Sequence, residues 1–546
     1  MVRSVFLRMM LVVVLICMSV LSACTTKPAP VEPTSNRETP DTWWNQSVFY
    51  QIFVRSFYDS NGDGVGDFQG IIQKLDYLND GDPSTTSDLG IQGIWLLPIH
   101  PSPSYHGYDV TDYYAVNPAY GTMDDFKQLL DEAHKRGIRI IMDLVINHTS
   151  EDHPWFQQAL DSKSPYRDWY IWSKEKPQYL GPWSQVVWHM SPTGGYYYGV
   201  FWSGMPDLNY QNPKVGEEME KIAGFWLKDV GVDGFRVDGA RHLIEDGEIQ
   251  ANSDATHAWF KDFYQYVKGI NPDAMIIGEV WDSVFAAVKY VKEDEFDLVF
   301  DFETASAILK GVGSGEARKI TDAINFNYGT YPLGRTAPFL TNHDMDRIMS
   351  QLGRDEDKAR VAASVMLTLP GVPFIYYGEE IGMIGTKPDE YIRTPMQWSG
   401  GKNAGFSIGL PWIGIKDDYP EKNVEQLSVM EDSLFTHYRR LVQVRNQSRV
   451  LQMGNILVVN TNDPNVYAVL RTWQGQLAFI VVNLGDEKVE NLVLNRMDGI
   501  SDGQYTLVPI FGEARSLSFS VSGDSGFSDL ELGEIAPYQT IILAGE

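Results

Sequence analysis

The chain alternates short apolar runs with amphipathic stretches over most of its length. Most of the apolar runs lack strict alternation of apolar and polar residues, as expected where both faces of a strand are covered. Segments such as 123–137 place apolar residues at helical spacing. Eight strands alternating with helices predict an α/β fold, a (β/α)8 TIM barrel. The predicted strands are 48–54, 93–98, 138–145, 234–238, 275–280, 298–302, 336–343 and 371–378.

Two segments interrupt this alternation. Residues 148–210 are rich in Trp, Tyr, Pro and Gly and have no helical periodicity, which predicts a small domain inserted after the third strand. From residue 454 to 546, strand-like runs are separated by turn signals, which predicts a C-terminal antiparallel β-sandwich domain. We therefore expect the catalytic barrel to span 42–453, with the insertion inside it.

The first residues carry targeting signals rather than part of the fold. Arg3 and Arg8 give a basic start, 9–21 is apolar, and "LSAC" ends at Cys24. This pattern resembles a bacterial lipoprotein signal over 1–24, which leaves Cys24 as an N-terminus carrying acyl chains such as palmitate. Residues 25–41 read as a flexible tether. The expected location is extracytoplasmic and membrane-anchored; a plain secretory signal with an incidental cysteine is the alternative.

The composition of the chain limits which kinds of molecule it is expected to bind. The net charge of -28 argues against nucleic acid and anionic membrane surfaces, and it suits a neutral substrate. Aromatic residues make up 12% of the chain, and 15 of them are Trp; much of this content belongs to the core, but sugar-binding clefts also use aromatic rings as stacking surfaces. We expect a monomer that contacts a membrane only through its N-terminal lipid.

The stretch "DSNGDGVGDF", residues 59–68, resembles a calcium-binding loop. Side-chain oxygens recur at alternate positions, as in an EF-hand, and a glycine allows a sharp turn. The final Glu of an EF-hand is replaced by Gly70, and a strand rather than a helix precedes the loop. A Gly/Asp-rich turn without metal is the alternative. The candidate ligands are Asp59, Asn61, Asp63, the carbonyl of Val65, and Asp67.

Three acidic residues stand at strand ends, where a barrel gathers its catalytic groups. They are Asp238, Glu279 and Asp344, and Arg236 lies two residues before the first of them. One Asp after a strand is usually a helix cap or a turn former. Three carboxylates at one rim are harder to explain in this way, because burying such charges without compensation is costly. Retaining cleavage of a glycosidic bond needs two carboxyls about 5 Å apart, one ionised and one protonated. Glu279, flanked by apolar residues, suits the protonated role.

The motifs at these strand ends resemble those of the α-amylase superfamily of glycoside hydrolases, and the match runs from about residue 42 to the end. The motifs are "DLVINH" (143–148), "MPDLN" (205–209), "GFRVDGARH" (234–242), "GEVWD" (278–282), "FLTNHD" (339–344) and "GVPFIYYGEE" (371–380). The resemblance implies Asp238 as nucleophile, Glu279 as general acid/base, and Asp344 as the carboxylate that holds sugar hydroxyls.

The same resemblance extends to substrate and metal. It implies that Tyr108, His148, Arg236 and His343 line the subsite of the sugar under attack. Arg241 and His242 would lie on the leaving-group side, or else on the surface of the following helix. Relatives that cleave oligosaccharides carry a similar loop after the first strand, which implies a structural calcium ion at residues 59–67.

The predicted activity is retaining endo-hydrolysis of α-1,4 bonds in starch-like α-glucans and maltooligosaccharides through a covalent glycosyl-enzyme intermediate. Exo-acting relatives have an aspartate three residues before the subsite tyrosine, whereas this chain has Tyr105. The 59–67 loop and "RTPMQW" (393–398) instead resemble the oligosaccharide-cleaving branch. An exo-acting α-glucosidase or oligo-1,6-glucosidase, a glucanotransferase, and a non-catalytic glucan-binding lipoprotein are the alternatives.

Overall fold

A computed structural model describes residues 39–545 except 497 and 524–525. The expected signal peptide, most of the tether and Cys24 therefore lie outside the described residues. In the part of the chain that is described, no helix has both the length and the apolar character that crossing a membrane requires.

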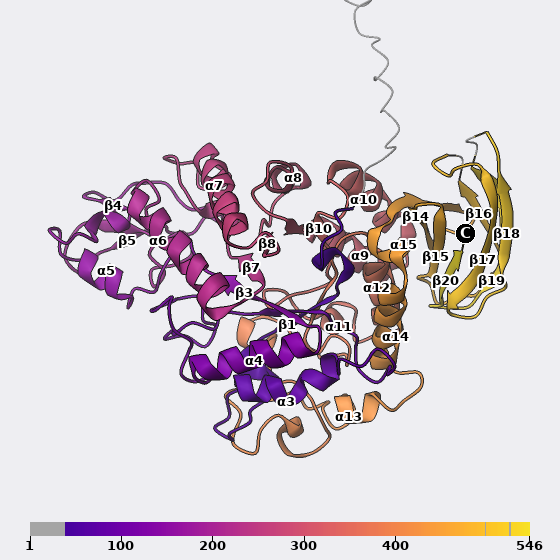
Figure 1. Cartoon of the computed structure of the whole chain (residues 1–546), viewed down its shortest axis with the longest axis horizontal. Helices are drawn as coiled ribbons and strands as arrows, with labels where there is room; N and C mark the ends of the chain where they lie inside the picture. The colour runs from indigo at the N-terminus through magenta and orange to yellow at the C-terminus, as the bar shows by residue number, and fades with distance from the viewer. Residues whose placement is uncertain (1–38, 497, 524–525, 546) are drawn as a thin grey trace, which may run out of the picture. The chain divides into compact units, whose positions relative to one another are not determined.

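Eight parallel strands form one sheet in the order β10-β9-β8-β7-β3-β2-β1-β11, and a parallel bridge between Phe339 and Phe374 brings its two edges together (Figure 1). The predicted (β/α)8 barrel is confirmed. Its strands are shorter than expected, because residues at their carboxyl ends leave the sheet and enter the loops. The strands are β1 (Phe49–Ile52), β2 (Gly93–Leu96), β3 (Arg139–Leu144), β7 (Gly234–Val237), β8 (Met275–Gly278), β9 (Leu298–Phe300), β10 (Thr336–Ala337) and β11 (Phe374–Tyr376).

Amphipathic helices connect the strands. In α4 the buried side chains are Phe126, Leu129, Leu130 and Ala133, the face that helical spacing predicts, and Thr122 and Asp125 form a capping box at its start. The longer helices are α3 (Phe68–Leu78), α4 (Met123–Lys135), α6 (Pro213–Gly224), α7 (Asp254–Ile270), α8 (Val284–Lys292), α9 (Phe302–Ser314), α10 (Ala317–Thr330), α12 (Glu356–Thr368) and α14 (Leu434–Gln447). The shorter ones are α2 (Val54–Phe57), α5 (Pro154–Ala159), α11 (Ile348–Gln351), α13 (Val424–Leu427) and α15 (Arg449–Met453).

Between β3 and α6 the chain forms a small three-stranded sheet, in the order β4-β6-β5. Its strands are β4 (Trp172–Ser173), β5 (Trp188–Met190) and β6 (Tyr196–Tyr198). Trp188 and Tyr198 pack with two valines in a core of their own. Antiparallel bridges from His148 to Asp207 and from Tyr170 to Leu208 close the base of this insertion.

The C-terminal part consists of two antiparallel sheets around a separate apolar core, as predicted. One sheet has the order β12-β14-β15-β20-β17-β18 and the other β13-β16-β19. The strands are β12 (Asn455–Val458), β13 (Asn460–Thr461), β14 (Val466–Trp473), β15 (Gln476–Asn483), β16 (Val489–Arg496), β17 (Gly503–Phe511), β18 (Leu517–Val521), β19 (Phe527–Ile535) and β20 (Thr540–Gly545).

Candidate active site

The three strand-end carboxylates lie at one rim of the barrel. Asp238 directly follows β7, Glu279 directly follows β8, and Asp344 lies in the loop after β10. Parallel strands point their carboxyl ends to the same side, so these side chains converge. Asp143 joins them from β3, where it pairs in register with Arg236 of β7.

The buried guanidinium of Arg236 contacts three carboxylates. Its Nη1 lies 2.7 Å from Asp143 Oδ1 and 2.6 Å from Asp238 Oδ1, and its Nη2 lies 3.0 Å from Glu279 Oε2. Arg236 is only 1% exposed. One cation does not neutralise three buried carboxylates, so the arrangement favours keeping a proton on one of them.

The direction of the pKa shifts agrees with this charge balance. Burial raises the pKa of Glu279 to about 7; Arg236 opposes the shift, and the neighbouring Asp238 and Asp344 add to it. Burial likewise raises the pKa of Asp143 to about 7 against the pull of Arg236. Burial also raises the pKa of Asp238 above its usual value; Arg236 opposes this shift, and Asp344 adds to it. Glu279 can therefore hold a proton near neutrality, as a general acid requires.

A second set of hydrogen bonds fixes Tyr108 and His343. The Gln51 amide donates to His343 Nδ1 at 2.7 Å, which leaves Nε2 as the protonated nitrogen. That nitrogen lies 2.6 Å from the Tyr108 hydroxyl, which in turn donates to Asp143 Oδ2 at 2.9 Å. Burial holds the pKa of His343 well below its usual value, so the ring is neutral. Tyr108 and His343 are thus rigidly placed beside the carboxylates.

Asp344 faces the open side of the site. Its side chain is 30% exposed, and its Oδ2 lies 3.1 Å from His343 Nε2. Arg393, in the loop after β11, donates from Nη2 to Asp344 Oδ1 at 2.8 Å and from Nε to the His343 carbonyl at 2.8 Å. The carboxylate is therefore held in place but stays accessible to a ligand.

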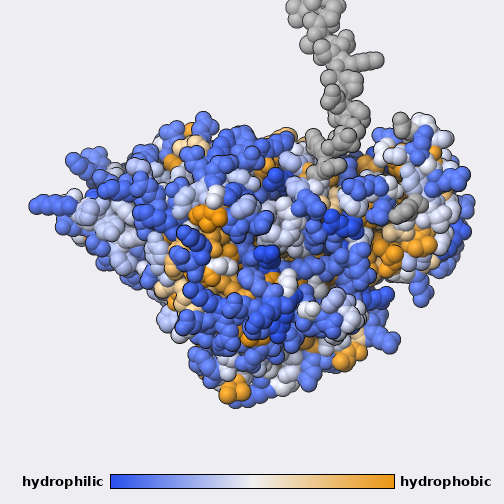
Figure 2. Space-filling view, viewed as in Figure 1, coloured by the Kyte–Doolittle hydropathy of each residue, from blue (hydrophilic) through white to orange (hydrophobic). Residues whose placement is uncertain are grey.

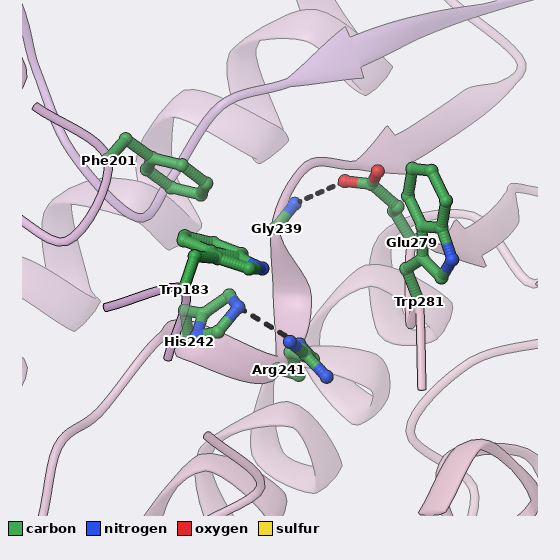
Figure 3. Close-up of a pocket in the computed structure, with 7 residues that line it drawn as sticks. All are labelled: Trp183, Phe201, Gly239, Arg241, His242, Glu279 and Trp281. Atoms are coloured by element: carbon green, nitrogen blue, oxygen red, sulfur yellow. Dashed lines mark hydrogen bonds between the residues drawn. The ribbon is translucent and has the colours of Figure 1, made fainter. Parts of the chain in front are cut away.

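A cavity of about 310 Å³ opens beside Glu279. Figure 3 shows Trp183, Phe201 and His242 on one side of it, Glu279 and Trp281 on the other, and Gly239 between them. Arg241 and His242, expected on the leaving-group side, both line it. The Gly239 backbone N–H donates to Glu279 Oε2 at 2.9 Å.

Arg241 and His242 point their polar atoms at protein partners. Arg241 Nη1 donates to Asp282 at 2.7 Å, and its Nε donates to His242 Nε2 at 2.9 Å. The remaining predicted residue, His148, is buried below the site; its Nε2 lies 3.1 Å from the Tyr108 carbonyl oxygen, and burial lowers its pKa to about 4.

Comparison of the chain with known proteins identifies the family to which it belongs. Residues 51–454 match the family model described as alpha amylase, catalytic domain. The chain belongs to the alpha-amylase family of glycoside hydrolases. It is 43% identical over 463 residues to Alpha-amylase 3 of Dictyoglomus thermophilum, an alignment that covers 83% of this chain and 87% of the relative.

Other alpha-amylase family members match at similar coverage. The oligo-1,6-glucosidase of Parageobacillus thermoglucosidasius is 34% identical over 521 residues, covering 82% of this chain and 91% of that protein. The crystal structure of the alpha-amylase from H. orenii superimposes with a TM-score of 0.81 at 44% identity and covers 92% of this chain and 99% of that one.

Sequence reasoning missed several residues of this alpha-amylase site. Asp143 stands in a motif that the sequence displayed, but only the strand register reveals its contact with Arg236. Arg393 also stands in a recognised motif, "RTPMQW", yet its contact with Asp344 joins segments 49 residues apart. Trp183 and Phe201 had no signal beyond the aromatic richness of the insertion.

The loop of candidate calcium ligands folds as a series of turns. The Asp59 carboxylate accepts hydrogen bonds from the backbone N–H groups of Asn61, Gly62 and Gly64, and Asp63 accepts one from Val65. Asp67 accepts from Ser60 and caps α3 through the Gly70 N–H. Across the described ranges, no three His, Cys, Asp or Glu side chains are grouped to hold a metal; the candidate set here includes an amide and a backbone carbonyl.

A second group of oxygens that could hold a cation lies between the barrel and the insertion. Asn147 Oδ1, Asp207 Oδ2 and Glu245 Oε1 are buried, and none has a hydrogen-bond partner among the residues that the structure describes. Burial raises the pKa of Asp207 to about 7 and that of Glu245 well above its usual value. A proton shared between the carboxyls or a bound cation would satisfy this group.

Proposed function

We propose that this protein is an extracytoplasmic, retaining endo-hydrolase of α-1,4 bonds in starch-like α-glucans and maltooligosaccharides. The observation that carries the proposal is the sharing of Arg236 between Asp238 and Glu279. Two carboxyls bound to one guanidinium lie close together, as retaining enzymes need at about 5 Å.

Asp238 is the nucleophile in this proposal. Its carboxylate attacks the anomeric carbon while Glu279 protonates the departing glycosidic oxygen, which forms a covalent glycosyl-enzyme and releases the first sugar product. The Glu279 carboxylate then takes a proton from water as that water displaces Asp238, which restores both groups. Asp344, held by Arg393, accepts hydrogen bonds from hydroxyls of the distorted sugar ring.

Endo-action is supported by the ring at position 105. Tyr105 stacks on Trp412 with ring centroids 5.4 Å apart, and the Arg393 guanidinium lies 5.9 Å from the Tyr105 ring. An aromatic ring there cannot accept the paired hydroxyl hydrogen bonds that would hold a terminal sugar. The alpha-amylase relative is also more similar to this chain, at 43% identity, than the oligo-1,6-glucosidase at 34%.

Starch viscosity followed against the reducing ends released tests endo-action. Internal cleavage lowers viscosity early and yields mixed maltooligosaccharides. Glucose as the sole early product, with viscosity nearly unchanged, would overturn the proposal.

An exo-acting α-glucosidase, oligo-1,6-glucosidase or glucanotransferase is the second candidate. It is favoured by the "RTPMQW" motif, by the 59–67 loop and by relatives named oligo-1,6-glucosidase. The carboxylates of the site serve either activity, so the product pattern separates them. A purely sugar-binding role fits less well, since all three carboxylates are present at the rim.

We also propose a structural calcium ion at Asp59, Asn61, Asp63, the carbonyl of Val65, and Asp67. The donors are all oxygens, which suits a hard cation. Asp59 and Asp67 are 5% exposed, and no Lys or Arg within the described residues pairs with the loop carboxylates, so a cation would balance their charge. The ion would stabilise the loop and take no part in the reaction.

Membrane attachment through lipid on Cys24, and a monomeric state, complete the proposal. Acyl chains contribute about 0.8 kcal/mol per buried CH₂ to membrane binding. Cys24→Ser is expected to release the protein from the membrane fraction of cells, as followed by fractionation. An unchanged membrane fraction in that variant would refute the anchor.

A further inference from the structure

Two arginines are buried where the barrel helices α12 and α14 meet β14 of the C-terminal sheets (Figure 1). Arg445 of α14 is 1% exposed, and Arg471 of β14 is 0% exposed. Among the residues that the structure describes, neither guanidinium forms an ion pair with an Asp or Glu side chain. Burying a cation without an anion beside it is costly. This arginine pair, Arg445 and Arg471, therefore needs another source of negative charge.

Other buried arginines of the barrel do have carboxylates beside them. Arg236 contacts three carboxylates at the catalytic rim. Arg347 lies close enough to Glu379 and Glu380 to oppose the rise of their pKa values that burial causes. The arginine pair differs from both, so burial of an arginine in this fold does not by itself explain the missing anion.

The arginine pair donates to backbone carbonyls at the carboxyl ends of two helices, α12 and α15. The acceptors are Leu367, Leu369 and Gly371 for Arg445, and Thr368, Gly454 and Asn455 for Arg471. The carboxyl end of a helix carries about half a negative elementary charge. Two helix ends therefore supply about one negative charge at most. Two guanidinium groups carry two positive charges, so about one positive charge remains unbalanced.

The arginine pair stays charged at neutral pH. Burial lowers the pKa of each guanidinium to about 9, and for Arg445 the neighbouring Arg471 adds to the shift. Burial also raises the pKa values of Tyr328 and Tyr467, the phenols beside the pair, so neither supplies a negative charge. Asp301 adds to the shift of Tyr328. Its carboxylate, however, accepts hydrogen bonds from Thr304 and Asn327 and from neither arginine.

Three donor groups at this place have no acceptor. Arg445 Nε, the Tyr467 hydroxyl and the Thr336 hydroxyl are buried, and none has a hydrogen-bond partner within the described residues. Gly371, whose carbonyl accepts from Arg445 Nη2 at 2.6 Å, packs against Thr336. Thr336 begins β10 and Gly371 precedes β11, so the group lies at the amino ends of the barrel strands, away from the catalytic carboxylates. Unpartnered buried donors beside an unbalanced positive charge are what an anion site offers.

We propose that the arginine pair binds one small monovalent anion, of the class of chloride, which accepts from Arg445 Nε and the Tyr467 hydroxyl. The unbalanced charge of about one indicates a monovalent rather than a divalent ion. The full burial of both donors indicates a small one. Because Arg445 belongs to the barrel and Tyr467 to the C-terminal sheets, the ion would hold these two parts together. The proposal does not depend on which bonds the enzyme cleaves.

Thermal unfolding of the full-length protein tests the site. The Tm is measured in sodium chloride and in sodium gluconate at equal ionic strength, with calcium added as its gluconate in both, because gluconate is too large for a buried site. An ion bound only by the folded state is expected to raise the Tm by about 2 °C or more, in a manner that saturates with chloride. Tyr467→Phe removes one donor and keeps the ring, so at least about half of this shift is expected to disappear.

Tyr505→Phe is the matched control for that variant. Tyr505 also lies in the C-terminal sheets, but its hydroxyl already donates to the Ser501 carbonyl at 2.8 Å. The chloride-dependent shift is expected to keep its wild-type size in this variant. A shift of wild-type size in Tyr467→Phe, or equal wild-type Tm values in the two salts, would overturn the proposal.

Bromide locates the ion without any substitution. In crystals of the wild-type protein grown in sodium bromide, an anomalous-scattering peak is expected between Arg445 Nε and the Tyr467 hydroxyl. Water at that position, or no density there, would overturn the anion site. The carbonyls at the ends of α12 and α15 would then be the only balance for the arginine pair.

Discussion

Arg236 decides how protons are shared among the acidic side chains around it. A carboxyl that is buried, near other carboxylates and only partly compensated by a guanidinium keeps its proton to higher pH. Glu279 meets these conditions: it is largely buried and lies near Asp238 and Asp344, and its pKa is raised to about 7. Asp238, 2.6 Å from Arg236 Nη1, has the contact that favours its ionised form.

A protonated Glu279 beside an ionised Asp238 predicts how the rate of hydrolysis depends on pH. In the proposed mechanism Glu279 acts when protonated, so kcat/KM on maltotetraose is expected to fall as the pH rises through about 7. With α-maltosyl fluoride, whose leaving group needs no proton, that fall is expected to be absent. Initial rates between pH 5 and 9 check this. Identical alkaline limbs for both substrates would contradict the role of Glu279 as acid.

The residues that the sequence could identify are those that end strands. Asp238 and Glu279 follow buried runs directly, so their position at the rim could be predicted from the strand pattern alone. Arg393 could not, because its contact with Asp344 depends on how the long loop after β11 folds back. The position of Trp183 could not be predicted either, because no sequence motif near it indicates that it lines the same cavity as Trp281.

Among the elements, strand number was predictable and strand length was not. The seventh barrel strand is the clearest case: residues 336–343 are predicted as one strand, yet β10 is only Thr336–Ala337. Pro338 has no N–H to continue the ladder, and the residues after it carry His343 and Asp344 instead. The sheet of the insertion escaped prediction because its strands have two or three residues and no alternation.

The loop after β1 carries a prediction about metal. If calcium binds the folded loop and not the unfolded chain, chelation lowers the Tm by mass action. Asp63→Ala is expected to remove most of the loop's share of that shift. Calorimetric scans with calcium and with EGTA measure it. Asp207→Asn serves as the control, because it alters the separate oxygen group at Asn147 and leaves the loop intact.

A chelation effect of wild-type size in Asp63→Ala, together with loss of that effect in Asp207→Asn, would place the ion at the second group. The loop would then be a metal-free turn, held by the backbone N–H bonds to Asp59.

At the scale of the whole molecule, the chain carries a net charge of -28 and presents a largely polar surface. The face in Figure 2 is mostly hydrophilic, with hydrophobic side chains exposed in separate patches. Below that surface, the C-terminal sheets contact α12 of the barrel through buried groups: Arg471 of β14 donates to the Thr368 carbonyl, and the Thr540 hydroxyl of β20 donates to the Ser364 hydroxyl at 2.7 Å. The sequence predicted the presence of the C-terminal domain, but not these contacts.

The buried carboxyl of Glu379 gives the stability of the whole fold a pH dependence. Glu379 follows β11 and accepts hydrogen bonds from Thr341, after β10, at 3.0 Å and from Tyr438, in α14, at 3.1 Å. Burial raises its pKa to about 8, and nearby Glu380 adds to the shift while Arg347 opposes it. The folded state therefore binds a proton that the unfolded state has lost above its ordinary pKa of about 4.3.

Because the folded pKa is the higher one, Glu379 stabilises the fold fully below about pH 4 and loses that contribution as the pH rises to about 8. Glu379→Gln imitates the protonated form, so the decline of Tm between pH 6 and 8 is expected to be shallower in the variant. Asp301→Asn is the matched control: Asp301 is buried as well, but its pKa is raised only to about 6, so this change is expected to alter the Tm profile below pH 6. If Glu379→Gln kept the wild-type slope from pH 6 to 8, the carboxyl would already be ionised in the folded protein, with its charge balanced by Arg347.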